Sequence, residues 1–279
     1  MTRFTLFWVI TSFFCLKQTG QAQELVPYKR LPLSSPVTVS SNQYGSVVTG
    51  DAKGVITLYD TLGNVVQRYA PAKVAPVTLL EAWQTLKVFA FHREMQSYTL
   101  LDRFLAPTAE QVSFINREAA EETIGYARLV TLANDNQLWI FDDTDFSLKK
   151  YNPATQQISL RASLELVLDP GNYQLEFMRE YQNMLFIADR NTGILVFDNL
   201  GNFRKKIGIK GVTFFGFTEN EIYLIAADTL LLLNLYTQQE RRFALPTGLA
   251  ATQATLFGKT VVLFSTQEMV FCSLPLTGR

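Results

Sequence analysis

Few residues of this chain have the types and spacing that chemistry requires, and the first is its single histidine, His92. One histidine cannot build a zinc site with two or three imidazole ligands, and a Ser-His-Asp triad would have to use this residue. His92 lies in the segment FHREM, residues 91–95, which we place in a loop between two strands. It could act there as a general base or a ligand, but we favour an exposed loop histidine.

Acidic residues gather at two places. The segment FDDTDF brings together Asp142, Asp143 and Asp145, and alternating carboxylates in a loop could hold calcium. The segment lacks the glycine and the distal glutamate of an EF-hand loop, so we expect solvated turn acids and no metal site. A second group has the spacing of one exposed face of a short helical connection and consists of Glu118, Glu121 and Glu122.

Phosphate-binding and nucleic-acid-binding signatures are weak. The segment FGKT, residues 257–260, would need a glycine where Gln253 stands to form a phosphate-binding loop. Basic residues cluster on two segments that we expect to be outermost strands, where charge discourages edge-to-edge pairing; they are Arg204, Lys205, Lys206, Arg241 and Arg242.

The N-terminus has the layout of an export signal. Residues 4–16 form an apolar run after Arg3, and small residues follow before Gln23. This run of 13 residues is shorter than the about 20 that a membrane-spanning helix needs. We therefore expect a signal peptide at residues 1–22 and a periplasmic or secreted mature chain at residues 23–279, without a transmembrane segment.

Composition limits the mature chain further. Its 23 basic and 25 acidic residues give a formal charge of −2, which argues against nucleic acid as a partner. Cys272 is its one cysteine, so no intramolecular disulfide can form. The whole chain is 48% hydrophobic, which is ample for a large core in one continuous domain.

Short runs rich in Val, Ile, Leu, Phe and Tyr recur between turn clusters, a pattern that predicts an all-β fold. Residues 54–69, GVITLYDTLGNVVQRY, align with residues 193–206, GILVFDNLGNFRKK. In each copy an aspartate, Asp60 or Asp198, can cap a turn in which the following glycine takes a positive φ. The two aspartates are 138 residues apart, which equals three repeats of 46.

The mature chain, residues 23–279, divides into six units of four strands. We place the third strands at residues 54–60, 97–102, 147–152, 193–198, 229–236 and 268–274. The sixth unit ends after three strands, and residues 28–34, YKRLPLS, can supply the fourth. Four-stranded repeats of about this length are typical of propeller blades, so we predict a six-bladed β-propeller of antiparallel blades, closed by an N-terminal strand.

Residues 187–202, IADRNTGILVFDNLGN, resemble the repeat of quinoprotein-like, YncE-like and NHL or TolB-like propellers. The match is carried by Ala188, Asp189, Thr192, Gly193 and Phe197. WD40 and kelch signatures are absent, as are the length and the vicinal cysteine pair of the quinone-dependent dehydrogenases in this group. The resemblance therefore implies the architecture, and we expect no cofactor.

A propeller gathers the loops from second to third strands on one face, together with the connections between blades. Ligands often bind at such a loop-bearing mouth. On that face we expect Asp51, Lys53, His92, Arg93, Glu94, Asp143, Asp145, Asp189, Arg190 and Asn191. From these we select as ligand-binding candidates Arg93, Glu94, Asp143, Asp189 and Arg190.

No catalytic constellation accompanies the repeat, so the sequence favours an exported, monomeric, non-enzymatic module that binds a protein, a glycan or a cell-envelope component. The alternative is a hydrolase or lyase that acts on a saccharide or peptide at the channel mouth, using carboxylates and Arg93 or Arg190. A third interpretation is a scaffold without a small-molecule site. The fold by itself does not decide among them.

Overall fold

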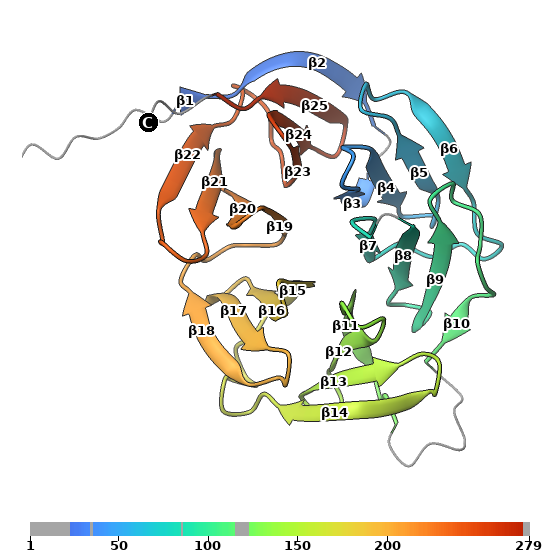
Figure 1. Cartoon of the computed structure of the whole chain (residues 1–279). Helices are drawn as coiled ribbons and strands as arrows, with labels where there is room; N and C mark the ends of the chain where they lie inside the picture. The colour runs from blue at the N-terminus through green and yellow to red at the C-terminus, as the bar shows by residue number, and fades with distance from the viewer. Residues whose placement is uncertain (1–22, 34–35, 85, 115–122, 276–279) are drawn as a thin grey trace, which may run out of the picture.

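The computed structural model describes residues 23–33, 36–84, 86–114 and 123–275. These residues form six sheets arranged as blades in a ring, which confirms the predicted six-bladed β-propeller (Figure 1). The described residues contain no helix, and hence none able to cross a membrane. The expected signal peptide and the three glutamates of the expected helical connection lie outside the described residues.

Each of the first three blades consists of four antiparallel strands in chain order from the ring axis outward. The first blade contains β3 (Pro36–Ser41), β4 (Val47–Asp51), β5 (Ile56–Tyr59) and β6 (Val65–Tyr69). The second contains β7 (Leu79–Glu81), β8 (Lys87–His92), β9 (Ser97–Asp102) and β10 (Val112–Ser113). The third contains β11 (Ala127–Leu132), β12 (Leu138–Asp142), β13 (Ser147–Asn152) and β14 (Gln157–Ser163).

The other three blades repeat this order, and two of them add a strand from the N-terminal segment. The fourth contains β15 (Leu175–Tyr181), β16 (Met184–Asp189), β17 (Gly193–Asp198) and β18 (Phe203–Ile207). The fifth contains β19 (Phe215–Thr218), β20 (Glu221–Ala226), β21 (Thr229–Asn234), β22 (Glu240–Ala244) and β1 (Gln23–Glu24). The sixth contains β23 (Gln253–Phe257), β24 (Thr260–Phe264), β25 (Glu268–Ser273) and β2 (Val26–Pro32).

The N-terminal segment closes the ring, as the sequence predicts. β2 pairs antiparallel with β25 from Val26 opposite Ser273 to Pro32 opposite Glu268. Just before it, β1 pairs in parallel with the outer edge of β22, a contact that the sequence did not predict. The segment therefore joins the fifth and sixth blades and covers two strand edges that would otherwise be open.

All six predicted third strands are present, as β5, β9, β13, β17, β21 and β25. Their side chains are largely buried because a third strand packs between neighbouring blades on both faces. The outermost strand β18 instead exposes four of its five residues, so its basic side chains lie where the sequence places them.

The duplicated turn has the predicted geometry in both copies. Asp60 Oδ1 accepts hydrogen bonds from the amides of Leu62 and Asn64 at 2.9 and 2.8 Å, and Asp198 makes the equivalent bonds. The turn glycines, Gly63 and Gly201, both have φ of +77°. A left-handed residue at this position lets a short loop reverse the chain, which is why glycine recurs there.

Candidate functional site

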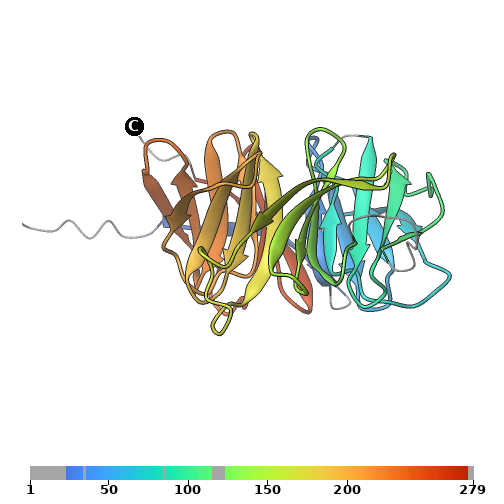
Figure 2. The same ribbon diagram turned by 90° about the horizontal axis from the view of Figure 1, so that it is seen from below.

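The loop face is defined here as the side of the ring that carries the connections from second to third strands and those between blades. Strands run between this face and the opposite one (Figure 2). The innermost strand of each blade starts at the loop face, because the preceding outermost strand ends there. Residues at the start of β11 and β15 therefore surround the loop-face mouth of the central channel.

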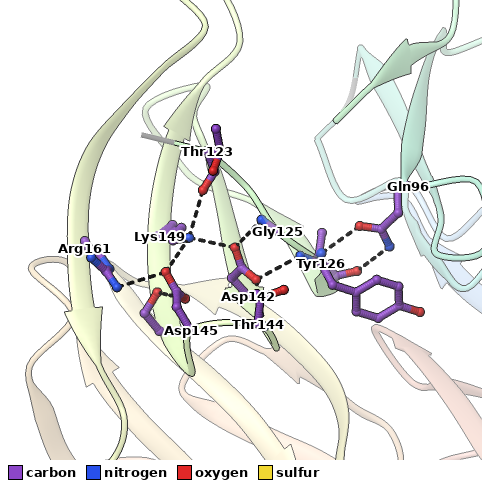
Figure 3. Close-up of polar contacts among 11 residues, drawn as sticks. Gln96, Thr123, Gly125, Tyr126, Asp142, Thr144, Asp145, Lys149 and Arg161 are labelled. Atoms are coloured by element: carbon purple, nitrogen blue, oxygen red, sulfur yellow. Dashed lines mark hydrogen bonds and ion pairs between the residues drawn. The ribbon is translucent and has the colours of Figure 1, made fainter. Parts of the chain in front are cut away.

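Asp142, expected as a solvated turn acid, is instead buried at the end of β12, with its residue 0% exposed. Its carboxylate accepts four hydrogen bonds (Figure 3). The donors are the amides of Gly125, Tyr126 and Thr144, at 2.7, 2.9 and 3.0 Å, and Lys149 Nζ at 2.6 Å. The segment that leads into β11 covers the end of β12 and shields the Asp142 side chain from water. A local sequence pattern cannot reveal such a contact.

The charge of Asp142 is retained in this buried position. Burial by itself raises the pKa of a carboxyl group, but the bonds from Lys149 and from the Tyr126 and Gly125 amides outweigh it. The pKa of Asp142 is consequently held below its ordinary value. Lys149 also donates to Thr123 O at 3.0 Å, so its ammonium group is satisfied inside the third blade.

Asp145 belongs to the same network. Its Oδ2 lies 2.7 Å from Lys149 Nζ and 3.0 Å from Arg161 Nη2 (Figure 3). Ser147 Oγ donates to its other oxygen at 2.6 Å. The Asp145 carboxylate is already paired with two cationic side chains. We therefore interpret this network as structural support for the loop face. Among the described residues, no three metal-ligating side chains come together.

Asp143 points to a different set of partners. Tyr173 donates its hydroxyl to Asp143 Oδ1 at 2.5 Å, and Arg128 Nη1 lies 3.4 Å from Oδ2. The Arg128 guanidinium also stands over the Tyr173 ring, 5.6 Å from its centroid. Burial and the hydrogen bond to Asp143 both raise the pKa of Tyr173, so the phenol stays protonated and acts as a donor.

Arg93 approaches the same place from the second blade. Its Nε donates to Arg128 O at 2.7 Å, which joins the second blade to the start of β11. Burial and the charge of Arg128 lower the pKa of Arg93, whereas Tyr126, Glu176 and Asp143 act in the opposite sense. The Arg93 guanidinium is thus held against the backbone of Arg128 in the neighbouring blade, where the charge of Arg128 acts on it.

The fourth blade completes this group. Glu176, near the start of β15, accepts a hydrogen bond from Gln174 Nε2 at 2.7 Å, and Arg190 Nη1 lies 4.0 Å from its carboxylate. The Arg190 side chain is about half exposed. We call the resulting group the loop-face cluster; it consists of Arg93, Arg128, Asp143, Tyr173, Glu176 and Arg190.

Three of the five candidates selected from the sequence, Arg93, Asp143 and Arg190, therefore lie in one cluster. Glu94 is exposed in the turn beside Arg93. Asp189 is buried at the end of β16. Its carboxylate accepts hydrogen bonds from the Gln174 amide at 2.9 Å and from Thr192 Oγ1 at 2.6 Å, and so stabilises the adjacent turn.

His92 is not the exposed loop residue that the sequence suggests. It ends β8 and is 1% exposed, with Nδ1 3.1 Å from Pro76 O. Burial lowers the pKa of His92 below its ordinary value, and the carbonyl groups of Pro76 and Ala75 offset part of that effect. Nε2 is also buried and has no hydrogen-bond partner in the described part of the chain.

Four important residues were missed by sequence reasoning: Gln96, Arg128, Tyr173 and Glu176. Gln96 has a φ of +46°, and its amide group bonds Ala127 N at 2.7 Å and Ala127 O at 3.0 Å, which fixes the second blade to the third (Figure 3). The sequence pattern could have identified Arg128 and Glu176 as residues of the channel mouth, because each is a charged residue at the second position of an otherwise largely apolar innermost strand.

Comparison with known proteins identifies the fold. No family model and no curated protein matches the chain. Among solved structures, virginiamycin B lyase from Staphylococcus aureus is similar with a TM-score of 0.61 and 10% identity, over 88% of this chain and 99% of that one. A streptogramin B lyase gives 0.61 and 13%, over 90% and 97%.

BamB from Moraxella catarrhalis gives a TM-score of 0.50 and 12% identity, over 89% of this chain and 99% of that one. Identities this low carry the fold and not the chemistry of a site. Together with the six closed blades, these similarities confirm the resemblance to repeat propellers: this chain is a six-bladed β-propeller.

Proposed function

We propose that this protein is an exported, monomeric, non-enzymatic binding module whose loop face holds an acidic segment of a partner protein. The observation that supports the proposal is the hydrogen bond from Arg93 Nε to Arg128 O at the channel mouth, where the charge of Arg128 lowers the pKa of Arg93. Like charges held together in a partly buried place repel each other, and an anionic group between them removes that repulsion.

The carboxylates of the loop-face cluster neutralise its arginines only in part. Arg128 meets Asp143 at 3.4 Å, and Arg190 meets Glu176 at 4.0 Å, both longer than a strong charged hydrogen bond. Asp143 is also shared with the Tyr173 hydroxyl. Three guanidinium groups from three blades are therefore available to carboxylates of a partner, and arginine forms paired hydrogen bonds with such groups.

The test measures the binding of a fluorescein-labelled hexaglutamate peptide by polarisation at low and high salt. Arg93→Gln and Arg128→Gln should each weaken binding by roughly tenfold at low salt, because each removes one charged donor. The matched control is Arg204→Gln, on the exposed outer strand β18, and it should leave binding unchanged. Absence of binding, or equal loss in the control, contradicts the proposal.

A hexagalacturonate probe tests whether a glycan is bound instead. Binding of this acidic oligosaccharide with the same dependence on arginine, without binding of the peptide, would replace the protein partner by a glycan. Export is tested separately by N-terminal sequencing of protein recovered outside the cytoplasm. The expected mature chain begins near Gln23, and a chain that keeps residues 1–22 there contradicts cleavage.

The alternative is a hydrolase or lyase at the same channel mouth, where arginines and carboxylates could stabilise charge and move protons. Single substitutions at Arg93, Asp143, Asp189 and Arg190 decide between the two in a broad panel of saccharide and peptide substrates. An activity that disappears with one of these changes replaces the binding module by an enzyme. The similarity to two lyases concerns the fold and does not favour either candidate.

A further inference from the structure

A second group of polar side chains lies inside the ring, away from the loop-face cluster. Glu81 ends β7, Thr131 lies late in β11, and Arg179 lies late in β15, which are the innermost strands of three consecutive blades (Figure 1). Glu81 contacts both of the others. Because the second and fourth blades are not neighbours, the contact between Glu81 and Arg179 lies on the channel side of the strands.

Glu81 already accepts two hydrogen bonds, and neither comes from Arg179 or Trp83. Thr131 Oγ1 donates to Oε1 at 2.5 Å and the Leu132 amide donates to Oε2 at 3.1 Å. Burial raises the pKa of Glu81, although Arg179, Thr131 and Leu132 favour the charged form. The indole N–H of Trp83 also favours the charged carboxylate, but its geometry is not that of a hydrogen bond.

Donors remain without acceptors beside this carboxylate. The Arg179 side chain is 9% exposed, and its Nε lies 3.6 Å from Glu81 Oε1, too far for a hydrogen bond. Arg179 Nε and Nη2 and Trp83 Nε1 are all buried and find no acceptor within the described ranges. A buried donor without an acceptor is costly, so this place favours a molecule that supplies acceptor oxygens.

Tyr223, on β20 of the fifth blade, is a further buried polar group. A Cβ on Gly216 of β19 would lie 2.2 Å from Tyr223 Oη. Only glycine at position 216 therefore leaves space for the aromatic ring of Tyr223. The Tyr223 hydroxyl accepts from the Leu256 amide of the sixth blade at 3.3 Å, and Arg179 is near enough to act on its pKa. Arg179 therefore lies beside the Glu81 carboxylate, and its Nε and Nη2 have no acceptor among the described residues.

We propose that Arg179 and Trp83 bind a small carboxylate in the central channel. A carboxylate offers two coplanar oxygens, which match the fork of a guanidinium group and leave an oxygen lone pair for the indole N–H. The ligand replaces the missing acceptors without displacing Thr131 or Leu132 from Glu81. Trp83 follows β7 at the end away from the loop face, so the site is separate from the one in the proposed function.

The test uses the full chain labelled with 15N and follows the indole N–H signals during titration with sodium formate. Trp83 should shift in a saturable manner. Trp139 provides an internal reference, because it is fully buried and its Nε1 already donates to Glu180 Oε2 at 2.5 Å. Sodium chloride at equal concentration should leave the Trp83 signal in place, since a spherical anion does not satisfy a planar fork.

Two variants check the assigned residues. Arg179→Lys should weaken formate binding by about tenfold, because a single ammonium group cannot make paired hydrogen bonds. Trp83→Phe keeps an aromatic side chain but removes the indole N–H. Weaker formate binding by this variant, measured by calorimetry, tests the proposal even if Arg179→Lys does not fold. The proposal is overturned if formate leaves the Trp83 signal unchanged, if chloride shifts it equally, or if formate binds Trp83→Phe as tightly as the natural chain.

Discussion

Lys149 and Asp142 form a salt bridge of 2.6 Å in which the two side chains are only 4% and 0% exposed. The pair connects neighbouring strands of the third blade and supports the connection that carries Tyr126. A buried charge is tolerated only when it is paired and hydrogen-bonded, and here both groups meet that condition. The stability of the loop face should depend on this pair.

Removing one partner of this pair should be costly. Lys149→Met leaves the Asp142 charge buried without its cation, so we expect a loss of about 3–5 kcal/mol in the free energy of unfolding. Urea denaturation measures it. Arg161→Met is the matched control, because Arg161 pairs with Asp145 but is 52% exposed, and its loss should stay below about 1 kcal/mol. Similar losses in both variants would show that burial does not govern the effect.

The turn glycine Gly63 should be intolerant of a side chain for two reasons. Its φ is +77°, and a Cβ there would lie 2.4 Å from Leu31 Cδ1 of the closing strand β2. Gly248→Ala isolates the first reason, because Gly248 has a φ of +80° with open space around it. We expect about 1 kcal/mol for Gly248→Ala and at least twice that for Gly63→Ala in thermal unfolding. Equal losses would exclude a link between this turn and ring closure.

The raised pKa of Glu81 predicts a specific dependence of stability on pH. A carboxyl group with a higher pKa in the folded than in the unfolded state binds its proton more tightly when folded. Its favourable contribution is complete below the ordinary value of 4.5 and is lost as pH rises through the folded pKa. Glu81→Gln should therefore lose less stability than the natural chain as pH rises above 4.5.

Chemical denaturation at a series of pH values checks this prediction, with Glu94→Gln as the control at an exposed position. The Arg179 ion pair forms only as Glu81 ionises and so belongs to the pH-dependent contribution that Glu81→Gln removes. The slopes of stability against pH are therefore compared, and not the absolute stabilities. Parallel slopes for the natural chain and Glu81→Gln would contradict the raised pKa.

Cys272 should resist alkylation in the native protein. Burial raises the pKa of its thiol to about 11, and the residue is 0% exposed. Since the thiolate is the reacting form, iodoacetamide at pH 8 should label the folded chain of residues 23–279, which lacks Cys15, far more slowly than the same chain in urea. The reference variant combines Cys272→Ser with Leu166→Cys, at a fully exposed position, and should react quickly. Fast native labelling of Cys272 would refute the burial.

Several features of the fold could be predicted because their causes are local. The third strand GILVFD is recognised by its apolar run, and its end is marked by Asp198, whose carboxylate caps the next turn. Closure by the N-terminal strand followed from counting strands, since the last blade lacked one. The pairing of β1 with β22 was not foreseeable, because two residues carry no pattern of their own.

The sites were harder to predict than the strands. The positions of Arg93, Asp143 and Arg190 on the loop face followed from loop counting, but Arg128 and Glu176, which join them into one cluster, lie within strands. His92 and Asp142 look like surface residues in the sequence and are buried in the structure. Each is the last residue of its strand, β8 or β12, and is covered by the segment that leads into the innermost strand of the same blade.

The sequence by itself determined the number of blades, the order of their strands and the chemistry of their turns, because side-chain alternation and turn geometry involve only neighbouring residues. The tertiary structure alone decided which polar groups share a site. Glu81 and Arg179 come from blades that are not adjacent, and they meet only when the ring closes and brings the innermost strands to a common axis. Contacts of that kind depend on the packing angle of every blade between them, which no local pattern encodes.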